Sequence, residues 1–136
     1  MTSTEREAFL ADLHVGVIAI ERPNRAPLAV PIWYAYEPGG DVLIWVETTS
    51  LKARLIRTAG RFALTVQTES PPYRYVTAEG TVTATEPAAE ELARSIAVRY
   101  LGQEAGAAYV AENLTDETIV IRMRPQRWLS TDASKQ

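Results

Sequence analysis

Large apolar side chains alternate with other residues through residues 28–36, and this alternation constrains the fold more than any other feature. Successive side chains of a β-strand point to opposite faces, so a period of two predicts a strand. Residues 38–41 (PGGD) follow, and proline and glycine in such a cluster favour a tight turn. Residues 42–47 show a second strand-like run. We therefore predict a β-hairpin formed by these two strands.

The rest of the chain switches between helical and strand-like periodicity, without an internal repeat. Helices are predicted over residues 4–13, 50–59, 87–101 and 105–113. Further strands are predicted over residues 15–21, 61–68, 73–85 and 118–123, with a last short strand that begins at Trp128. This order of elements favours an α+β fold, an antiparallel barrel with helices at its ends.

Individual residues predict where these elements begin, bend or end. They are a capping box of Thr4 and Glu7, a helix stop at Gly60, a bulge or bend at Gly80, a helix start at Pro87 and a strand interruption at Pro125.

The composition limits the class of protein. A chain of 136 residues fits one domain over 1–136, and the absence of cysteine excludes disulfides and thiol chemistry. A net charge of −3 indicates no general attraction to nucleic acid or to anionic membranes. No apolar run approaches the roughly 20 residues that span a bilayer, and the charged N-terminal residues do not resemble a signal peptide. We expect a cytoplasmic protein.

Three hydroxyl side chains, Thr48, Thr49 and Ser50, stand between a predicted strand and a predicted helix. The first N–H groups of a helix have no partner within the helix and lie at the positive end of its dipole, so phosphate groups bind there. A simpler interpretation makes Ser50 or Thr49 only the N-cap of the helix.

Basic residues near the start of this helix favour the anion site. Lys52 and Arg54 lie in the first turn, Arg57 follows, and no acidic residue occurs within 48–60. A cation in the first turn opposes the helix dipole by roughly 0.3–1 kcal/mol at an exposed site. That cost is small enough for solvated side chains, but combined with the hydroxyl groups the pattern indicates an anion site.

Other chemical signals are weak. His14 is the only histidine, and nothing in the sequence places a nucleophile or an acid beside it, so a structural role is favoured. One histidine without cysteine makes a zinc site improbable, and no glycine-rich nucleotide-binding loop occurs. Aromatic residues such as Trp45 are assigned by default to the core or to an interface. Pro31 lies within a predicted strand, which an edge position, a bulge or a backbone facing a ligand would explain.

Four segments together resemble the pyridoxamine 5′-phosphate oxidase-like split-barrel superfamily. They are residues 27–34 (PLAVPIWY), the turn at 38–41, residues 45–55 (WVETTSLKARL) and residues 74–82 (RYVTAEGTV). The resemblance covers about residues 5–130. Its most specific parts are the hydroxyl-rich turn, the lysine two residues after Ser50, and the following strand with its Glu-Gly pair.

This resemblance implies a homodimeric split β-barrel with two cofactors at the dimer interface, either FMN or deazaflavin F-420, and haem in a minority of members. The turn with Lys52 would hold the cofactor phosphate, Arg54 would assist, and the backbone of 30–33 would lie along the ring system. Tyr75 would lie near the cofactor, and Trp128 would reach the site of the partner subunit. The implied cofactor-binding residues are Val30, Pro31, Ile32, Trp33, Thr48, Thr49, Ser50, Lys52, Arg54, Tyr75 and Trp128. The cofactor carries the hydride, so no catalytic side chain is expected.

Departures from the oxidase pattern narrow the expected activity. Leu51 stands where the oxidase has an arginine before its phosphate lysine, and Arg127 and Trp128 are followed by Leu129 instead of substrate-binding residues. Pyridoxamine phosphate oxidation is therefore disfavoured. The sequence of residues 50–57 (SLKARLIR) resembles F-420-using reductases more closely. The alternatives are an FMN oxidoreductase of the same fold, a non-catalytic flavin or haem carrier or sensor with His14 as the haem ligand, and a pure interaction module.

Overall fold

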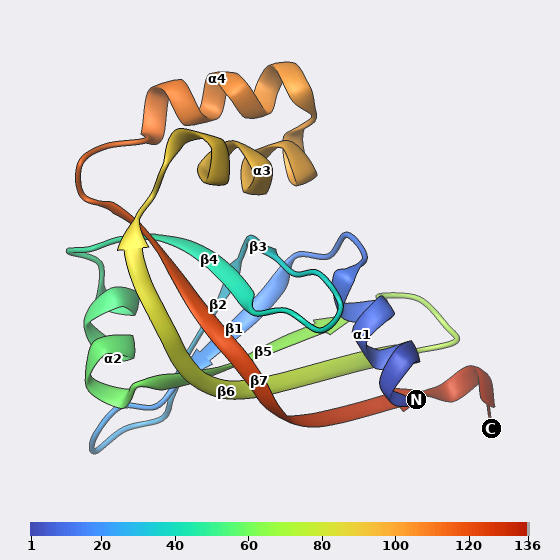
Figure 1. The fold of residues 1–136 in the computed structure, drawn as a ribbon. Coiled ribbons are helices and arrows are strands. Elements are labelled where there is room, and N and C mark those ends of the chain that lie inside the picture. The colour runs from blue at the N-terminus through green and yellow to red at the C-terminus, as the bar shows by residue number, and fades with distance from the viewer. Residues whose placement is uncertain (136) are drawn as a thin grey trace.

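The computed structural model describes residues 1–135, in which seven antiparallel strands form one sheet of order β2-β1-β5-β6-β7-β4-β3. The strands are β1 (Gly16–Ile20), β2 (Leu28–Ile32), β3 (Tyr34–Ala35), β4 (Val42–Glu47), β5 (Arg61–Gln67), β6 (Arg74–Pro87) and β7 (Thr118–Asp132). The helices are α1 (Ser3–Ala11), α2 (Leu51–Ala59), α3 (Glu90–Leu101) and α4 (Gln103–Asn113), followed by a 3-10 turn at Ala133–Lys135. Figure 1 shows a curled sheet with the α3–α4 hairpin over one end, which confirms the predicted α+β class.

The closure of the sheet depends on Trp33. The strands β2 and β3 are the two edges of the sheet, yet only this residue separates them in the chain. The sheet must therefore curl until its edges approach each other. The single strand predicted over 28–36 is wrong, because β2 pairs with β1 whereas β3 pairs with β4. Pro31 lies on edge strand β2, which confirms the edge explanation for a proline that donates no ladder hydrogen bond.

The long strands β6 and β7 pair along their whole length, with a register shift between Glu79 and Gly80 that confirms the predicted bulge. An ideal Cβ atom at Gly80 would lie 1.7 Å from the carbonyl oxygen of Arg124, so the chain needs glycine here. Pro125 does not interrupt the last strand as predicted, and no separate strand begins at Trp128. Pro125 lies opposite Gly80 at the bulge, where the ladder is already irregular and a missing N–H group is tolerated.

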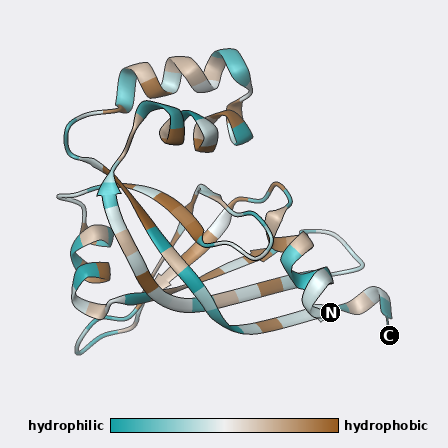
Figure 2. Ribbon diagram, viewed as in Figure 1, coloured by the Kyte–Doolittle hydropathy of each residue, from teal (hydrophilic) through white to brown (hydrophobic). Residues whose placement is uncertain are grey.

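The barrel interior is a continuous hydrophobic core built from alternate residues of the strands. Burial alternates regularly along β4 and β5, and Figure 2 shows hydrophobic and hydrophilic residues interspersed along the long strands. Phe9 and Leu10 of α1 and Ala53 and Ile56 of α2 pack on the same core. Burying one such large aliphatic side chain stabilises the fold by roughly 1.5–3 kcal/mol, so the two helices are held against the barrel by their apolar faces.

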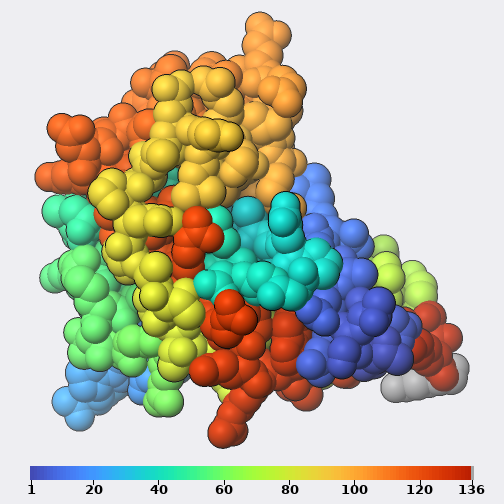
Figure 3. Space-filling model, viewed as in Figure 1, coloured from blue at the N-terminus to red at the C-terminus, as the bar shows by residue number. Residues whose placement is uncertain are grey.

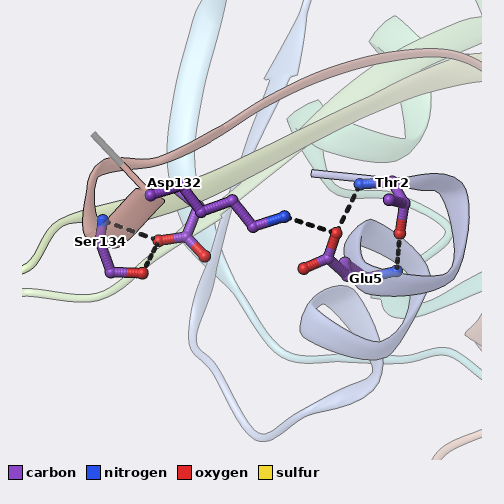
Figure 4. A network of polar contacts seen from close by, with 5 residues as sticks. Thr2, Glu5, Asp132 and Ser134 are labelled. Carbon is purple, nitrogen blue, oxygen red and sulfur yellow. Dashed lines mark hydrogen bonds and ion pairs between the residues drawn. The ribbon is translucent and has the colours of Figure 1, made fainter.

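The N-terminal helix begins earlier than predicted. The capping box consists of Thr2 and Glu5 instead of Thr4 and Glu7, because the Thr2 hydroxyl accepts from the Glu5 N–H and the Glu5 carboxylate accepts from the Thr2 N–H. The same carboxylate accepts from the Lys135 ammonium at 2.7 Å, which joins the two ends of the described chain (Figure 4). A cap that also pairs with the C-terminal turn favours this earlier start.

The other helix boundaries follow their caps. Ser50 caps α2 and Gly60, at φ 71°, ends it as predicted. Pro87 is not in a first helical turn, because it still pairs with Ile119 at the end of β6, and α3 begins three residues later at Glu90. None of the helices within residues 1–135 is long and apolar enough to cross a membrane.

Candidate functional site

A cavity of about 290 Å³ lies between the open end of the sheet and the α3–α4 hairpin. Figure 3 shows the side chains of this hairpin seated directly on the β3–β4 region. The strands around Trp33, the end of β4, the start of α2 and both hairpin helices contribute to it. Its lining residues are Pro31, Ile32, Trp33, Trp45, Val46, Glu47, Ser50, Lys52, Ile96 and Tyr109.

The predicted phosphate turn is only partly directed into this cavity. Ser50 lines it, and the Ser50 hydroxyl oxygen accepts from the Ala53 N–H at 3.1 Å, so the N-cap interpretation is correct for this residue. The hydroxyl hydrogen of a capping serine still remains available to donate to a ligand. The two threonines do not line the cavity: Thr49 is exposed, and Thr48 is engaged by another side chain.

That side chain is Arg57. The guanidinium of Arg57 donates to the Thr48 carbonyl at 3.0 Å and to the Thr48 hydroxyl at 3.4 Å, from the opposite end of α2. Arg57 is therefore a structural tie between α2 and the turn that precedes it. Arg54 is exposed and does not line the cavity, which leaves Lys52, half-buried, as the cation of the α2 start that faces it.

An acidic residue that the sequence interpretation missed also lines the cavity. Glu47 ends β4 immediately before the hydroxyl-rich turn, just outside the acid-free interval of 48–60. Its carboxylate accepts from the Thr118 hydroxyl at 3.0 Å and from the Thr115 hydroxyl at 3.4 Å. These hydrogen bonds draw the carboxylate toward the start of β7, so that it does not cap α2.

The segment 30–33, predicted to lie along the ring system of the cofactor, contributes three of its four residues to the cavity lining. Pro31, Ile32 and Trp33 line the cavity, whereas Val30 packs on the barrel core. The indole of Trp33 stacks on the ring of Tyr100 from α3, with centroids 5.0 Å apart and planes 6° from parallel. This contact fixes the position of the indole at the edge of the cavity.

Four further lining residues, Trp45, Val46, Ile96 and Tyr109, were not singled out from the sequence as ligand contacts. Trp45 alternates with the buried residues of β4 and so faces the cavity, a position that the strand period indicates. Ile96 and Tyr109 come from α3 and α4. Helical periodicity predicts that these residues belong to helices, but not where the hairpin docks on the barrel.

Two of the predicted contacts lie away from this cavity within the chain. Tyr75 pairs with Thr131 of β7 on the long β6 strand. The ring of Trp128 meets that of Tyr36 edge-on at 6.3 Å and lies under the Arg6 guanidinium at 4.8 Å. Trp128 lines a separate cavity of about 210 Å³, so one chain does not bring it together with Lys52.

His14 has a structural environment. Its Nε2 atom donates to the Phe9 carbonyl oxygen at 2.9 Å, and its ring packs against the Phe9 ring with centroids 4.6 Å apart. Because a carbonyl oxygen can only accept, the hydrogen lies on Nε2 and that atom has no lone pair left for a metal. This geometry does not support His14 as a haem ligand through Nε2.

Comparison with known families identifies the chain. Residues 2–129 match the model of a family described as pyridoxamine 5′-phosphate oxidase. The chain belongs to this family. No curated protein matches the chain.

Several solved structures have the same fold as this chain. A conserved hypothetical protein from Mycobacterium tuberculosis is 21% identical, with a TM-score of 0.82 over 99% of this chain and 87% of that chain. An F-420 reductase is 23% identical, with a TM-score of 0.65 over 90% of this chain and 94% of that chain. An FAD-binding protein from Mesorhizobium loti is 18% identical, with a TM-score of 0.69 over 96% of this chain and 91% of that chain. The predicted split-barrel architecture is therefore confirmed.

Proposed function

We propose that this protein is an oxidoreductase that binds a flavin-type cofactor, with deazaflavin F-420 favoured over FMN, and moves a hydride to or from an unsaturated organic substrate. The observation that carries the proposal is that Lys52 and Ser50, at the start of α2, line the same cavity as Pro31 and Trp33. This arrangement supports a phosphate at the helix start and a flat ring along the neighbouring wall.

The α2 start fits a phosphate group. The N–H groups of Leu51 and Lys52 precede the Ala53 N–H that Ser50 caps and have no partner within the helix, the Ser50 hydroxyl can donate, and Lys52 supplies the positive charge. No acidic residue occupies the first turn of α2. Glu47 is the negative group nearest in the chain, and its hydrogen bonds to two threonines hold its carboxylate at the β7 side.

The size of the cavity supports a homodimer. Pockets that enclose a small-molecule ligand have volumes of roughly 300–1,000 Å³, so a cavity of about 290 Å³ is at the lower end of this range. A cofactor with several fused rings and a phosphate would extend beyond it. We propose that a second copy of this chain covers the remainder and contributes Tyr75 and Trp128, with residues 1–136 of each copy forming one domain of a cytoplasmic enzyme.

When bound, the cofactor supplies the hydride chemistry, and the protein binds and orients it and excludes water. Lys52 and Ser50 would anchor the phosphate, and the segment 31–33 would lie along the ring. The preference for F-420 is supported by the sequence of residues 50–57 (SLKARLIR) and by the F-420 reductase among the structural neighbours. The absence of an arginine at Leu51 argues against pyridoxamine phosphate oxidation.

Calorimetric titration of the purified protein with F-420 and with FMN tests this proposal. We expect at least one of them to bind, and we expect Lys52→Ala to weaken that binding about tenfold or more, since a charge-assisted contact is lost. Lys135→Ala is the matched control, because Lys135 pairs with Glu5 at the C-terminal turn. Failure of both cofactors to bind the wild-type protein would refute the proposal; binding without turnover of any unsaturated substrate would favour a carrier.

A further inference from the structure

Another cavity, of about 560 Å³, lies on the outer face of the sheet and is larger than the one at the α2 start. Its floor contains Ala19 and Ala63, which lie opposite each other on β1 and β5 and alternate with buried core residues. Pockets that enclose small-molecule ligands have volumes of roughly 300–1,000 Å³. The two cavities share no lining residue, so the proposed function leaves this one unused.

The bulge between β6 and β7 shapes the polar rim of this cavity. The register shift after Glu79 makes Gln126 an extra residue on β7. Successive residues of a regular strand point to opposite faces, yet Gln126 and Arg127 both line the cavity, because a bulge redirects the side chains beside it. The side-chain oxygen of Gln126 accepts from the Thr81 N–H at 3.2 Å. This bond holds the amide at the rim, with its own N–H groups available to a ligand.

Glu79 and Arg127 carry opposite charges at this rim without pairing. They lie directly opposite each other on β6 and β7, where the Cβ atoms of cross-strand neighbours are roughly 4.5–5.5 Å apart. Both side chains are exposed, and within residues 1–135 no ion pair joins them. Arg61 and Glu21, at the same rim, do form an ion pair, with 2.5 Å between guanidinium and carboxylate. One negative and one positive group therefore remain for a ligand.

The chemistry of these groups indicates the class of ligand. The planar guanidinium of Arg127 can bind a carboxylate through two parallel hydrogen bonds. The carboxylate of Glu79 can accept hydrogen bonds from an ammonium group. Between them the floor presents the small side chains of Ala19 and Ala63. A ligand that suits this arrangement has a charge of each sign and a small, uncharged middle.

We propose that this cavity binds a small zwitterion of the amino-acid and short-peptide class, with its carboxylate at Arg127 and its ammonium at Glu79. The Gln126 amide donates to an oxygen atom of the same ligand. This site does not rest on the oxidoreductase function proposed above. It lies four residues further along β6 than Tyr75, roughly 13 Å away at the rise of a β-strand.

The dipeptide L-alanyl-L-alanine is a suitable probe. N-acetyl-L-alanyl-L-alanine lacks the ammonium and L-alanyl-L-alanine amide lacks the carboxylate, so these two compounds are matched controls. Because ion pairs at an exposed rim are weak, the titration is followed by the amide resonances of the ¹⁵N-labelled protein. We expect the dipeptide to shift the resonances of Thr81 and Gln126, and each control to bind roughly two- to fivefold more weakly. Equal binding of the three compounds, or no shift at these residues, would overturn the proposal.

Variants at the rim identify the two contacts. Glu79→Gln and Arg127→Ala should each weaken dipeptide binding roughly two- to fivefold, the range of an exposed ion pair. The acetylated dipeptide should lose no affinity in Glu79→Gln, and the amidated dipeptide none in Arg127→Ala, because each compound lacks the group that the mutated residue would bind. Arg54→Ala and Glu112→Gln, at exposed residues outside this cavity, are the matched controls. Equal losses in the control variants would exclude the site.

Sedimentation of the same variants tests a different occupant of this rim. A second copy of the chain also carries the two charges and could pair with them. If Glu79→Gln and Arg127→Ala weaken self-association and the dipeptide shifts no resonance, the rim docks a second copy and the ligand site is wrong. Unchanged sedimentation together with weakened dipeptide binding supports the ligand site.

Discussion

Trp33 and Tyr100 stack in nearly parallel planes, and this contact joins the seam of the barrel to the helical hairpin above it. Trp33 is the residue at which the chain passes from one edge of the sheet to the other. Tyr100 also bonds to backbone groups on both sides of that seam, at His14 and Tyr34. One aromatic pair therefore determines both where the hairpin sits and how the cavity wall is oriented.

Removal of the Tyr100 hydroxyl should test this link. We expect Tyr100→Phe to keep the ring stack but to lower the free energy of unfolding by about 1–3 kcal/mol, because part-buried backbone groups lose their partner. Urea denaturation followed by circular dichroism measures the change. Tyr73→Phe, at a side chain that is 56% exposed, should stay within about 0.5 kcal/mol of wild type. Equal stability of the two variants would show that the hydroxyl bonds contribute little.

The bulge at Gly80 gives a second prediction. A methyl group there would overlap the Arg124 carbonyl of the paired strand, so Gly80→Ala should cost more than about 3 kcal/mol or prevent folding. Gly102→Ala is the comparison, because its Cβ would meet no atom within 4 Å and only its φ of 84° is unfavourable. That strain costs about 1–2 kcal/mol. Thermal unfolding of both variants should rank them in this order, and the reverse order would contradict the bulge geometry.

The sequence predicts most strands correctly because their alternation reflects a real inside and outside. It could not predict the break at Trp33. Ile32, Tyr34 and Tyr36 are all buried, so the period of two continues through the break although the partner strand changes. Periodicity reports which face a side chain occupies and not which strand lies beside it.

In the candidate site, too, local effects could be predicted from the sequence and long-range contacts could not. Ser50 and Lys52 could be placed at a helix start because caps and dipoles are local effects. The role of Arg57 could not, since its contact with Thr48 depends on the turn bending back along α2. Tyr109 could not be placed at all, because the docking of a helical hairpin on a barrel depends on contacts far apart in the sequence.

The link between Glu5 and Lys135 predicts a pH dependence. The hydrogen bond from Lys135 and those from Thr2 lower the pKa of Glu5 from 4.5 to about 2. A carboxylate with a lowered pKa stabilises the fold when ionised, so its contribution is complete above about pH 5 and is lost as the pH falls toward 2. The stability difference between wild type and Glu5→Gln should therefore be present at neutral pH and shrink in acid, and salt should reduce it because the site is exposed.

Unfolding of both proteins in urea, from pH 7 down to pH 2, measures this difference. Glu112→Gln, at an exposed residue of α4, provides the control and should show no comparable trend. A difference between wild type and Glu5→Gln that stays constant across this range would mean that the capping hydrogen bonds, and not the charge of Glu5, stabilise the N-terminus.

The two basic residues of α2 should respond in opposite ways to mutation. Lys52 lies in the first turn, where its charge opposes the helix dipole, so Lys52→Ala should raise the free energy of unfolding by up to about 1 kcal/mol. Arg57 lies in the last turn and donates to Thr48, so Arg57→Ala should lower it by about 0.5–1.5 kcal/mol. Cofactor binding should follow the reverse order, with Lys52→Ala losing affinity and Arg57→Ala retaining it. Thermal unfolding and calorimetric titration of the same two variants measure both quantities.

A lysine retained at a cost in stability is the pattern expected of a ligand-binding residue. Loss of both stability and binding in Lys52→Ala would instead assign Lys52 to the structure of the helix.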